Sequence, residues 1–137
     1  MEIEYIKKQL MDLSKRAYLT NEVPVGALLV KDGKIVSKAY NKREATYNPL
    51  HHAEILCIIK ETRKQKYWRL NGYSMYVTLE PCEMCKKVIE ACGIKDVHYF
   101  VKSNSIKSKI KTEYKKEMDS VEYEELIKNF FKKIRKE

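Results

Sequence analysis

The chain of 137 residues carries a formal net charge of +9, from 28 lysine and arginine residues against 19 aspartate and glutamate residues. This length fits one hydrophobic core, so we expect a single domain over residues 1–137. No apolar run approaches the roughly 20 residues of a membrane-spanning helix, and the first residues do not resemble a signal peptide. We therefore expect a cytoplasmic protein without a membrane contact.

The first part of the chain predicts one helix and a β-hairpin. Apolar residues recur at steps of three and four from Ile3 to Ala17, which is typical of an amphipathic helix that packs as an outer layer. Residues 25–30 form an apolar run suited to a buried strand. An Asp-Gly pair follows in residues 31–34 and indicates a tight turn, so residues 35–40 should return as the antiparallel partner.

The middle of the chain predicts alternating helices and strands. Asn48 can cap a helix that has Pro49 at its first position. A strand follows at residues 73–78, then a helix over residues 81–93, then another strand at residues 97–100. This order predicts a three-layer α/β/α domain with a mixed sheet of about five strands.

The last part of the chain is basic. Residues 102–116 contain six lysines and one glutamate. A final basic helix over residues 121–137 should bury its apolar side chains, which are Leu126, Ile127, Phe130 and Ile134. Lysine runs are usually solvated faces, but this late charge also favours contact with RNA. The candidate RNA contacts are Lys102, Ser103, Asn104, Lys107, Lys132 and Lys133.

Two short motifs predict a metal site. The tripeptide ending at Glu54 reads H-A-E, and after 26 intervening residues the chain reads P-C-E-M-C, ending at Cys85. A catalytic zinc keeps three protein ligands and leaves a fourth position for water, so one of these four side chains has another role. In this arrangement the histidine and both cysteines hold the metal, and the glutamate moves protons during deamination of a base. We predict one Zn²⁺ per chain, held by His52, Cys82 and Cys85, with Glu54 as the catalytic residue.

The predicted helices explain how these side chains meet. His52 and Glu54 are two residues apart and would not share a face within a helix, but at its first turn both can reach a metal beyond the helix end. Cys82 and Cys85 share a face at a second helix start, where the positive end of the dipole favours thiolate. We therefore expect two helix N-termini to meet at the zinc.

Other histidines and cysteines have simpler interpretations. His51 lies next to the predicted ligand but outside the H-x-E register. Cys57 and Cys92 fall within predicted helices, where small buried residues are common. His98 lies in a strand pattern and is most simply a packed or exposed strand residue.

Further segments complete a family pattern. They are residues 23–27 (Val-Pro-Val-Gly-Ala), Asn41, residues 48–54 and residues 78–85. In order and spacing they resemble bacterial tRNA-specific adenosine deaminases, within the cytidine-deaminase-like superfamily. Guanine deaminases of that superfamily tend to have Pro-Phe-Gly and Cys-Glu-Pro-Cys where this chain reads Pro-Val-Gly and Leu-Glu-Pro-Cys. The resemblance therefore favours the tRNA enzymes.

The resemblance implies a hydrolase that converts adenosine to inosine at the wobble position of a tRNA anticodon, in particular that of an arginine tRNA read as ACG. It also implies a homodimer. Asn41 would hold the base through its amide, and the backbone N–H of Ala53 would face the developing oxygen. Asparagine after a strand often closes a turn, so a purely local role for Asn41 stays open.

Two other functions remain open from the sequence. A deaminase of a free nucleobase or nucleoside, such as guanine or cytosine, would share every zinc residue. A non-catalytic zinc-stabilised RNA-binding module would not need Glu54. The chain also departs from the resembled family, because it reads Phe100-Val101-Lys102-Ser103-Asn104 where those enzymes usually carry a Gly-Ala-x-Asp segment, so the acidic side chain is absent. We hypothesise looser control of the strand around the target, including activity on a DNA hairpin.

Overall fold

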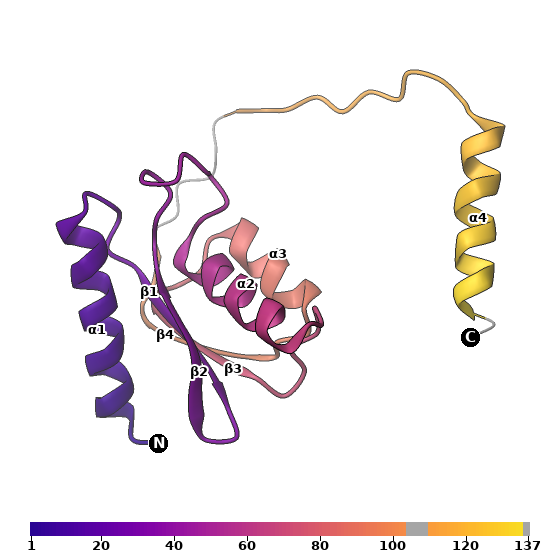
Figure 1. Cartoon of the computed structure of the whole chain (residues 1–137). Coiled ribbons are helices and arrows are strands. Elements are labelled where there is room, and N and C mark those ends of the chain that lie inside the picture. Colours follow the sequence, from indigo (N-terminus) through magenta and orange to yellow (C-terminus); the bar gives the residue numbers. More distant parts are fainter. Residues whose placement is uncertain (104–109, 136–137) are drawn as a thin grey trace. The chain divides into compact units, whose positions relative to one another are not determined.

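The computed structural model describes residues 1–103 and 110–135 of the chain (Figure 1). The chain forms two compact units, residues 1–105 and residues 106–137, and each is considered by itself. The expectation of one domain over the whole chain stays a prediction. Asn104 and Lys107, two of the candidate RNA contacts, lie outside the described residues. No helix of the described residues is long and apolar enough to cross a membrane.

The first unit is built on a four-stranded mixed sheet in the order β2-β1-β3-β4. The strands are β1 (Gly26–Lys31), β2 (Lys34–Tyr40), β3 (Ser74–Leu79) and β4 (Asp96–Val101). β1 pairs antiparallel with both β2 and β3, whereas β3 and β4 are parallel. The predicted antiparallel hairpin and the succession of helices and strands along the chain are therefore confirmed.

The expected fifth strand is not found in the described parts of the chain, so the sheet has four strands. The lysine-rich segment over residues 110–120 has no regular structure. This segment lacks the run of alternating apolar residues that lets a strand bury one of its faces.

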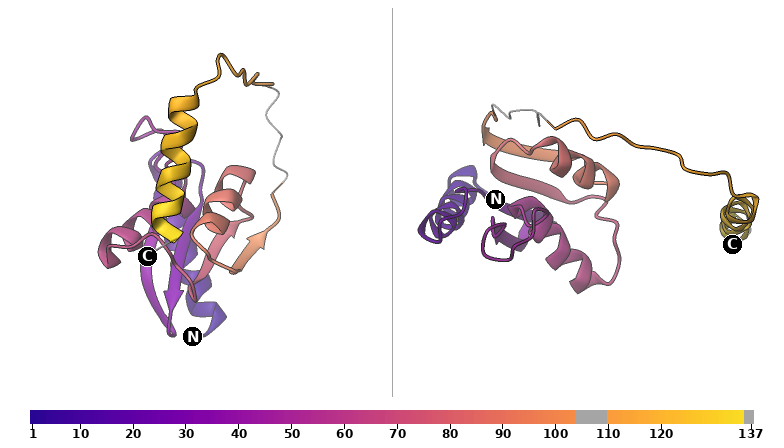
Figure 2. Two further views of the ribbon diagram at one scale, coloured as in Figure 1. Left: turned by 90° about the vertical axis from the view of Figure 1, so that its right-hand side faces the viewer. Right: turned by 90° about the horizontal axis from the view of Figure 1, so that it is seen from above.

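Helices cover both faces of the sheet (Figures 1 and 2). Side chains alternate between the two faces along β1, so Leu28 packs against α1 (Ile3–Leu19), whereas Ala27 and Leu29 face the opposite side. That side is covered by α2 (Ala53–Gln65) and α3 (Glu83–Ala91). The three-layer α/β/α arrangement agrees with the expected fold.

Gly26 allows α1 to approach the sheet closely. A Cβ atom at this position would lie 2.7 Å from Cβ of Leu13 and 2.9 Å from the backbone oxygen of Leu10. Both distances are shorter than real Cβ contacts, and the oxygen cannot move without moving the helix. A side chain here would therefore push α1 away from β1.

The two central helices begin later than the sequence predicts. α2 starts at Ala53 with His52 as its N-cap, not near Pro49. The expected cap, Asn48, closes a separate turn because its Oδ1 accepts the backbone N–H of Leu50 at 2.9 Å. Similarly, α3 starts at Glu83 and has Cys82 as its N-cap. Metal-binding candidates therefore occupy the N-cap positions of both helices.

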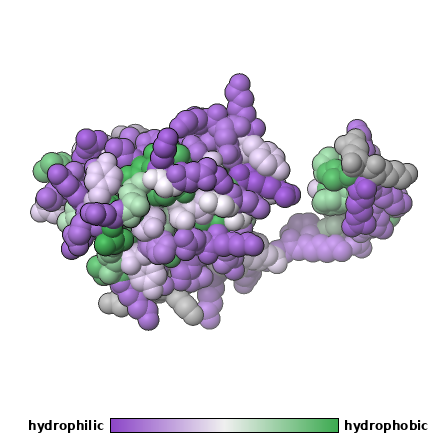
Figure 3. Space-filling model, turned by 90° about the horizontal axis from the view of Figure 1, so that it is seen from below, coloured by the Kyte–Doolittle hydropathy of each residue, from purple (hydrophilic) through white to green (hydrophobic). Residues whose placement is uncertain are grey.

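Among its described residues, the second unit contains one helix, α4 (Val121–Arg135), which begins where Ser120 Oγ accepts the backbone N–H of Tyr123 at 3.2 Å. Figure 3 shows apolar side chains gathered on one side of this helix and polar ones on the other. The expected burial of its apolar residues is not observed, since Leu126, Ile127, Phe130 and Ile134 are all exposed. The described part of this unit offers no second helix or strand against which α4 could pack.

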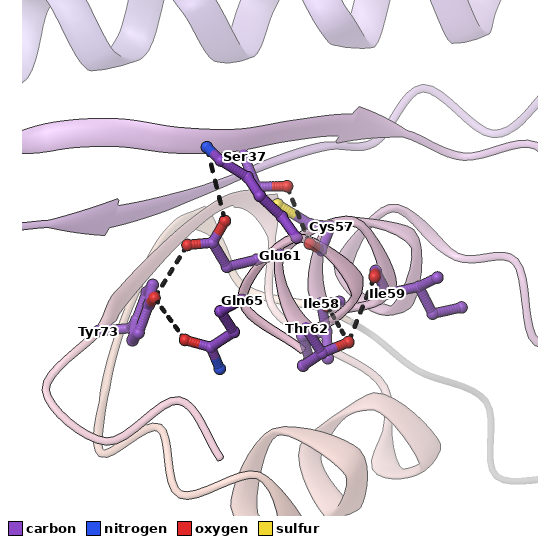
Figure 4. Close-up of polar contacts among 9 residues, drawn as sticks. Ser37, Cys57, Ile58, Ile59, Glu61, Thr62, Gln65 and Tyr73 are labelled. Carbon is purple, nitrogen blue, oxygen red and sulfur yellow. Dashed lines mark hydrogen bonds and ion pairs between the residues drawn. The ribbon is translucent and has the colours of Figure 1, made fainter. Parts of the chain in front are cut away.

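A buried carboxylate lies on α2, two turns beyond the helix start (Figure 4). Glu61 is only 4% exposed, and its Oε2 accepts a hydrogen bond from the hydroxyl of Tyr73 at 2.9 Å. The same hydroxyl lies 3.0 Å from Oε1 of Gln65. Oε1 of Glu61 has no hydrogen-bond partner among the described residues, and Nζ of Lys64 lies 3.9 Å from it. This cluster ties α2 to the start of β3.

Candidate active site

Three metal-binding side chains meet between the first turns of α2 and α3. Nδ1 of His52 lies 3.4 Å from Sγ of Cys85 and 3.7 Å from Sγ of Cys82. The three donor atoms all lie within 4.8 Å of one another. The structure thus brings together the three predicted ligands from two helix starts.

The donor set fits a catalytic zinc. Two sulfur atoms and one imidazole nitrogen are typical zinc donors, and three protein ligands leave a fourth position open. Burial, together with the charge of Arg43, lowers the pKa of His52 and so favours the neutral imidazole that binds metals. Burial raises the pKa of the Cys85 thiol well above its usual range, and a divalent cation between these groups would reverse that effect.

Glu54 lies beside this cluster on the first turn of α2. Glu54 is only 3% exposed. Burial raises the pKa of its carboxyl group, whereas the contact with Cys85 lowers that pKa by a smaller amount. It lines the same open cavity as His52 and Cys82. This position is suited to proton transfer, because the carboxylate is held by the helix and faces the space that a substrate would fill.

Asn41 and Ala53, the predicted substrate-binding residues, also line the cavity. Oδ1 of Asn41 accepts the backbone N–H of Arg43 at 3.0 Å, and its Nδ2 donates to the carbonyl of Val23 at 3.4 Å. The local turn-closing role is therefore present, and contact with a base stays a prediction. Ala53 is the first residue of α2, where backbone N–H groups have no acceptor within the helix.

The cavity has walls that the sequence patterns did not reveal. Its apolar lining comes from Val23, Val25 and Leu79, and two further charged side chains, Arg43 and Glu80, lie along it. A flat aromatic ring can pack between apolar walls while polar groups fix its orientation. The short spacing from Asn41 to Arg43 was the only sequence signal that could have pointed to the arginine.

Glu80 holds the chain that follows β4 next to the cavity. Its Oε1 accepts the backbone N–H of Ser103 at 3.2 Å, and its Oε2 pairs with Nζ of Lys86 at 3.3 Å. The hydrogen bond from Lys86 is the main reason why the pKa of the Glu80 carboxyl is lowered. Ser103 therefore lines the cavity, whereas Lys102 is exposed, and the contact of either residue with RNA stays a prediction.

A second carboxylate fixes the loop between β2 and α2. Glu22 is 5% exposed, and its two oxygens accept the backbone N–H groups of Glu44 at 2.8 Å and Ala45 at 2.7 Å. Hydrogen bonds to an ionised acceptor are the stronger kind. The loop that carries Arg43 is thus held by a side chain more than 20 positions earlier in the chain.

The remaining candidates lie away from the metal cluster. His51 Nδ1 lies 2.8 Å from Oγ1 of Thr46, and its Nε2 lies 3.1 Å from Nδ2 of Asn48. Cys57 and Cys92 are buried and do not belong to the cluster. The ring of His98 stacks on Tyr76, with 4.5 Å between the centroids.

Lys132 and Lys133 lie in the last turns of α4, where the described side chains are exposed. They belong to the second unit of the chain, so their contact with RNA stays a prediction.

Comparison with known proteins identifies the class. The family model described as "Cytidine and deoxycytidylate deaminase zinc-binding region" matches residues 1–101, which include the whole cavity except Ser103. A solved guanine deaminase from Bacillus subtilis has the same fold, with a TM-score of 0.80, 21% identity and coverage of 96% of this chain and 95% of that one. The fold and the donor set together define a zinc-dependent deaminase domain.

Relatives with higher sequence identity identify the family within this class. The tRNA-specific adenosine deaminase of Aquifex aeolicus is 37% identical, over 96% of this chain and 95% of the relative. That of Rickettsia bellii is 38% identical, over 87% and 92%. A solved structure from a study of A-to-I editing by tRNA:A34 deaminases at the wobble position matches with a TM-score of 0.73 and 31% identity, covering 75% of this chain and 79% of that one. The chain belongs to the tRNA-specific adenosine deaminase family.

Proposed function

We propose that this protein converts adenosine to inosine by hydrolytic deamination at the wobble position of a tRNA anticodon. The resemblance to bacterial enzymes points to an arginine tRNA read as ACG. One observation carries the proposal: Glu54 lines a single open cavity together with His52 and Cys82 of the metal cluster, in a chain whose relatives are tRNA-specific adenosine deaminases.

Glu54 would carry out the chemical step together with the metal. When bound, zinc supplies Lewis-acid chemistry that makes water a nucleophile near neutral pH. Glu54 takes the proton from the attacking water and passes it to the ring nitrogen next to carbon 6 of adenine. It then takes the proton of the new hydroxyl group at carbon 6 and passes it to the departing amino group, so that ammonia leaves and the carbonyl of inosine forms.

Other groups position the base. The walls formed by Val23, Val25 and Leu79 can pack against the flat faces of the purine. Asn41 can offer its amide to the edge of the ring, and the free backbone N–H of Ala53 can donate to the oxygen that develops at carbon 6. The target must leave any base stack, which is least costly in a single-stranded anticodon loop.

An assay on two kinds of substrate tests this function. The zinc-loaded protein is incubated with an anticodon stem-loop that carries ACG and, separately, with free adenosine, guanine and cytosine. Inosine should form at the first anticodon position of the stem-loop, with little product from the free compounds. Product from guanine or cytosine and none from the stem-loop would instead assign the protein to the metabolic deaminases.

We further infer that the protein acts in the cytoplasm as a homodimer. A tRNA substrate supports that location, and the family resemblance supports the dimer, with the helices around the metal site as the expected contact. Sedimentation at several protein concentrations tests the oligomeric state. A species with the mass of one 16.3 kDa chain at micromolar concentration would contradict it.

A further inference from the structure

We propose that Arg43 binds a backbone phosphate next to the target nucleotide and so selects a base within a strand over a free base. This proposal deepens the function above and rests on it. Neither the sequence motifs nor the relatives assign a role to this residue.

The first argument is the position of Arg43. It lines the cavity that also contains His52, Glu54 and Cys82, and it is exposed, so it lies where that cavity opens to solvent. A base that enters far enough to reach Glu54 brings its sugar and flanking phosphates to the opening. A cation there meets a negative charge that a free base does not carry.

The second argument is that the guanidinium group is free. Among the described residues, no carboxylate lies within ion-pair distance of Arg43 and no acceptor binds its side chain. Two carboxylates line the same cavity: Glu54 lies beside the metal ligands, and Glu80 is already paired with Lys86. A planar guanidinium can donate two parallel hydrogen bonds to one phosphate, which makes arginine a geometrically specific phosphate ligand.

The third argument is that the backbone around this free side chain is fixed. The N–H of Arg43 donates to Asn41 Oδ1 at 3.0 Å, and its carbonyl accepts the N–H of Asn48 at 3.2 Å. The next two N–H groups in the chain donate to the buried carboxylate of Glu22. The loop is therefore ordered before substrate arrives, which reduces the entropy cost of forming the phosphate contact.

Lys42 provides a matched control. It carries the same charge one position earlier in the loop, but it does not line the cavity, and its Nζ lies 5.0 Å from the centre of the Tyr40 ring. If the loop contributes only general attraction to RNA, substitutions of Lys42 and Arg43 should have similar effects. If Arg43 has a specific phosphate ligand, only its substitution should change the response to the loss of one phosphate charge.

The experiment combines protein variants with altered RNA. Single-turnover rates and equilibrium binding are measured for the parent, Arg43→Ala, Arg43→Lys and Lys42→Ala, all zinc-loaded. The substrates are the ACG stem-loop and two versions in which a neutral methylphosphonate replaces one of the phosphates flanking the target adenosine. Zinc content and circular dichroism establish that each variant is folded.

For the parent and for Lys42→Ala, one methylphosphonate should reduce kcat/KM and affinity by about ten-fold, as expected for a hydrogen bond to a charged group. For Arg43→Ala, the unmodified RNA should show that same loss, and the methylphosphonate should add less than about two-fold. Arg43→Lys should fall between these values because lysine keeps the charge but not the paired donors.

Two results would overturn this role for Arg43. One is that the losses from Arg43→Ala and from each methylphosphonate multiply, and the other is that Lys42→Ala has the same effects as Arg43→Ala. A parent protein that forms no inosine on the unmodified stem-loop would overturn the proposed function itself, and the role of Arg43 with it.

Discussion

Nδ1 of His52 and Sγ of Cys85 lie 3.4 Å apart although 33 positions separate them in the chain. His52 is the N-cap of α2, and Cys85 lies in the first turn of α3. A metal bound between them would therefore link two helices that follow different strands of the sheet. Such a link closes a long loop of chain and adds binding free energy to the free energy of folding.

We expect one zinc ion per chain, and Cys85→Ala should lose it. The variant removes one of three ligands, so metal affinity and the free energy of unfolding should both fall. Elemental analysis of protein purified without chelator and thermal unfolding provide the measurements. Cys92→Ala is the control, since it removes a buried thiol outside the cluster and should keep its zinc. Stoichiometric zinc in Cys85→Ala would contradict the ligand assignment.

Glu54→Gln should keep the zinc and the fold but lose turnover. Glutamine has nearly the same shape as glutamate but cannot accept the proton, and positioned proton transfer is worth about 10²–10⁴-fold in rate. Single-turnover assays on the stem-loop should show a loss of at least about 10²-fold, with zinc content unchanged. Near-normal deamination by this variant would show that another group moves the proton.

Gly26→Ala should destabilise the first unit by about 1–3 kcal/mol. The added methyl group would lie within 3.0 Å of both Leu13 Cβ and the Leu10 carbonyl oxygen, so α1 must move away from the sheet. Denaturant unfolding measures the loss. Gly33→Ala should lower the stability by about 1–2 kcal/mol for a different reason. A Cβ atom at Gly33 meets nothing within 4 Å, but φ is +74°, a backbone conformation that L residues with a side chain disfavour. Unchanged stability of Gly26→Ala would mean that the helix adjusts freely.

Tyr73→Phe should reduce stability by about 1–3 kcal/mol at neutral pH. The change removes the hydroxyl that donates to the buried Glu61 carboxylate, whose other oxygen has no hydrogen-bond partner among the described residues. Denaturant unfolding is compared with Tyr67→Phe, whose ring is exposed and which should be nearly neutral. Equal effects of the two substitutions would contradict a role for this hydrogen bond.

The same tyrosine predicts a loss of stability at alkaline pH. Burial, followed by the contact with Glu61, raises the pKa of Tyr73 to about 12, above the unfolded value of about 10. The folded state therefore holds this proton more tightly, so its stabilising contribution is complete below about pH 10 and is lost as the pH rises towards 12. The free energy of unfolding should fall more steeply between pH 10 and 12 in the parent than in Tyr73→Phe. Parallel curves would rule out this linkage.

Charge reversal of Lys132 and Lys133 should raise KM for tRNA without changing zinc content. If each lysine contacts one phosphate, the slope of log affinity against log salt should become shallower by about 0.7–0.9 for each lost contact. Filter binding at several salt concentrations measures this slope. Reversal of Lys7 and Lys8, two exposed lysines on α1, controls for net charge. Identical slopes in the two variants would leave the end of α4 as an ordinary solvated surface.

Much of the metal site could be predicted because its residues lie close together in the sequence. H-x-E and P-C-x-x-C each place their donors within one helical turn, and the strand signals around them place both turns at the same sheet. The exact helix starts could not be predicted, because Asn48 can either cap a helix or close a turn. The bond from its Oδ1 to the N–H of Leu50 selects the turn, and α2 then starts at Ala53.

The cavity walls were harder to predict because they depend on distant contacts. Arg43 lines the cavity because Glu22 fixes the backbone just after it, and Ser103 does so because Glu80, 23 positions earlier, binds its N–H. Neither pairing has a periodic pattern in the sequence. An isolated arginine in a polar loop is most often a solvated residue, so only the folded chain distinguishes it from its neighbours.

The metal cluster and Glu54 stand on the first turns of α2 and α3, whereas the residues that border the cavity opening come from loops. A helix start that packs on a hydrophobic core tolerates little change, but a loop held by one carboxylate can exchange its exposed side chains. If Arg43 binds the substrate strand as proposed, the reaction and the choice of substrate are encoded in separate parts of the chain. On that proposal, we expect substitutions at positions such as Arg43 or Ser103 to change which nucleic acid the enzyme accepts while the residues of the chemical step stay intact.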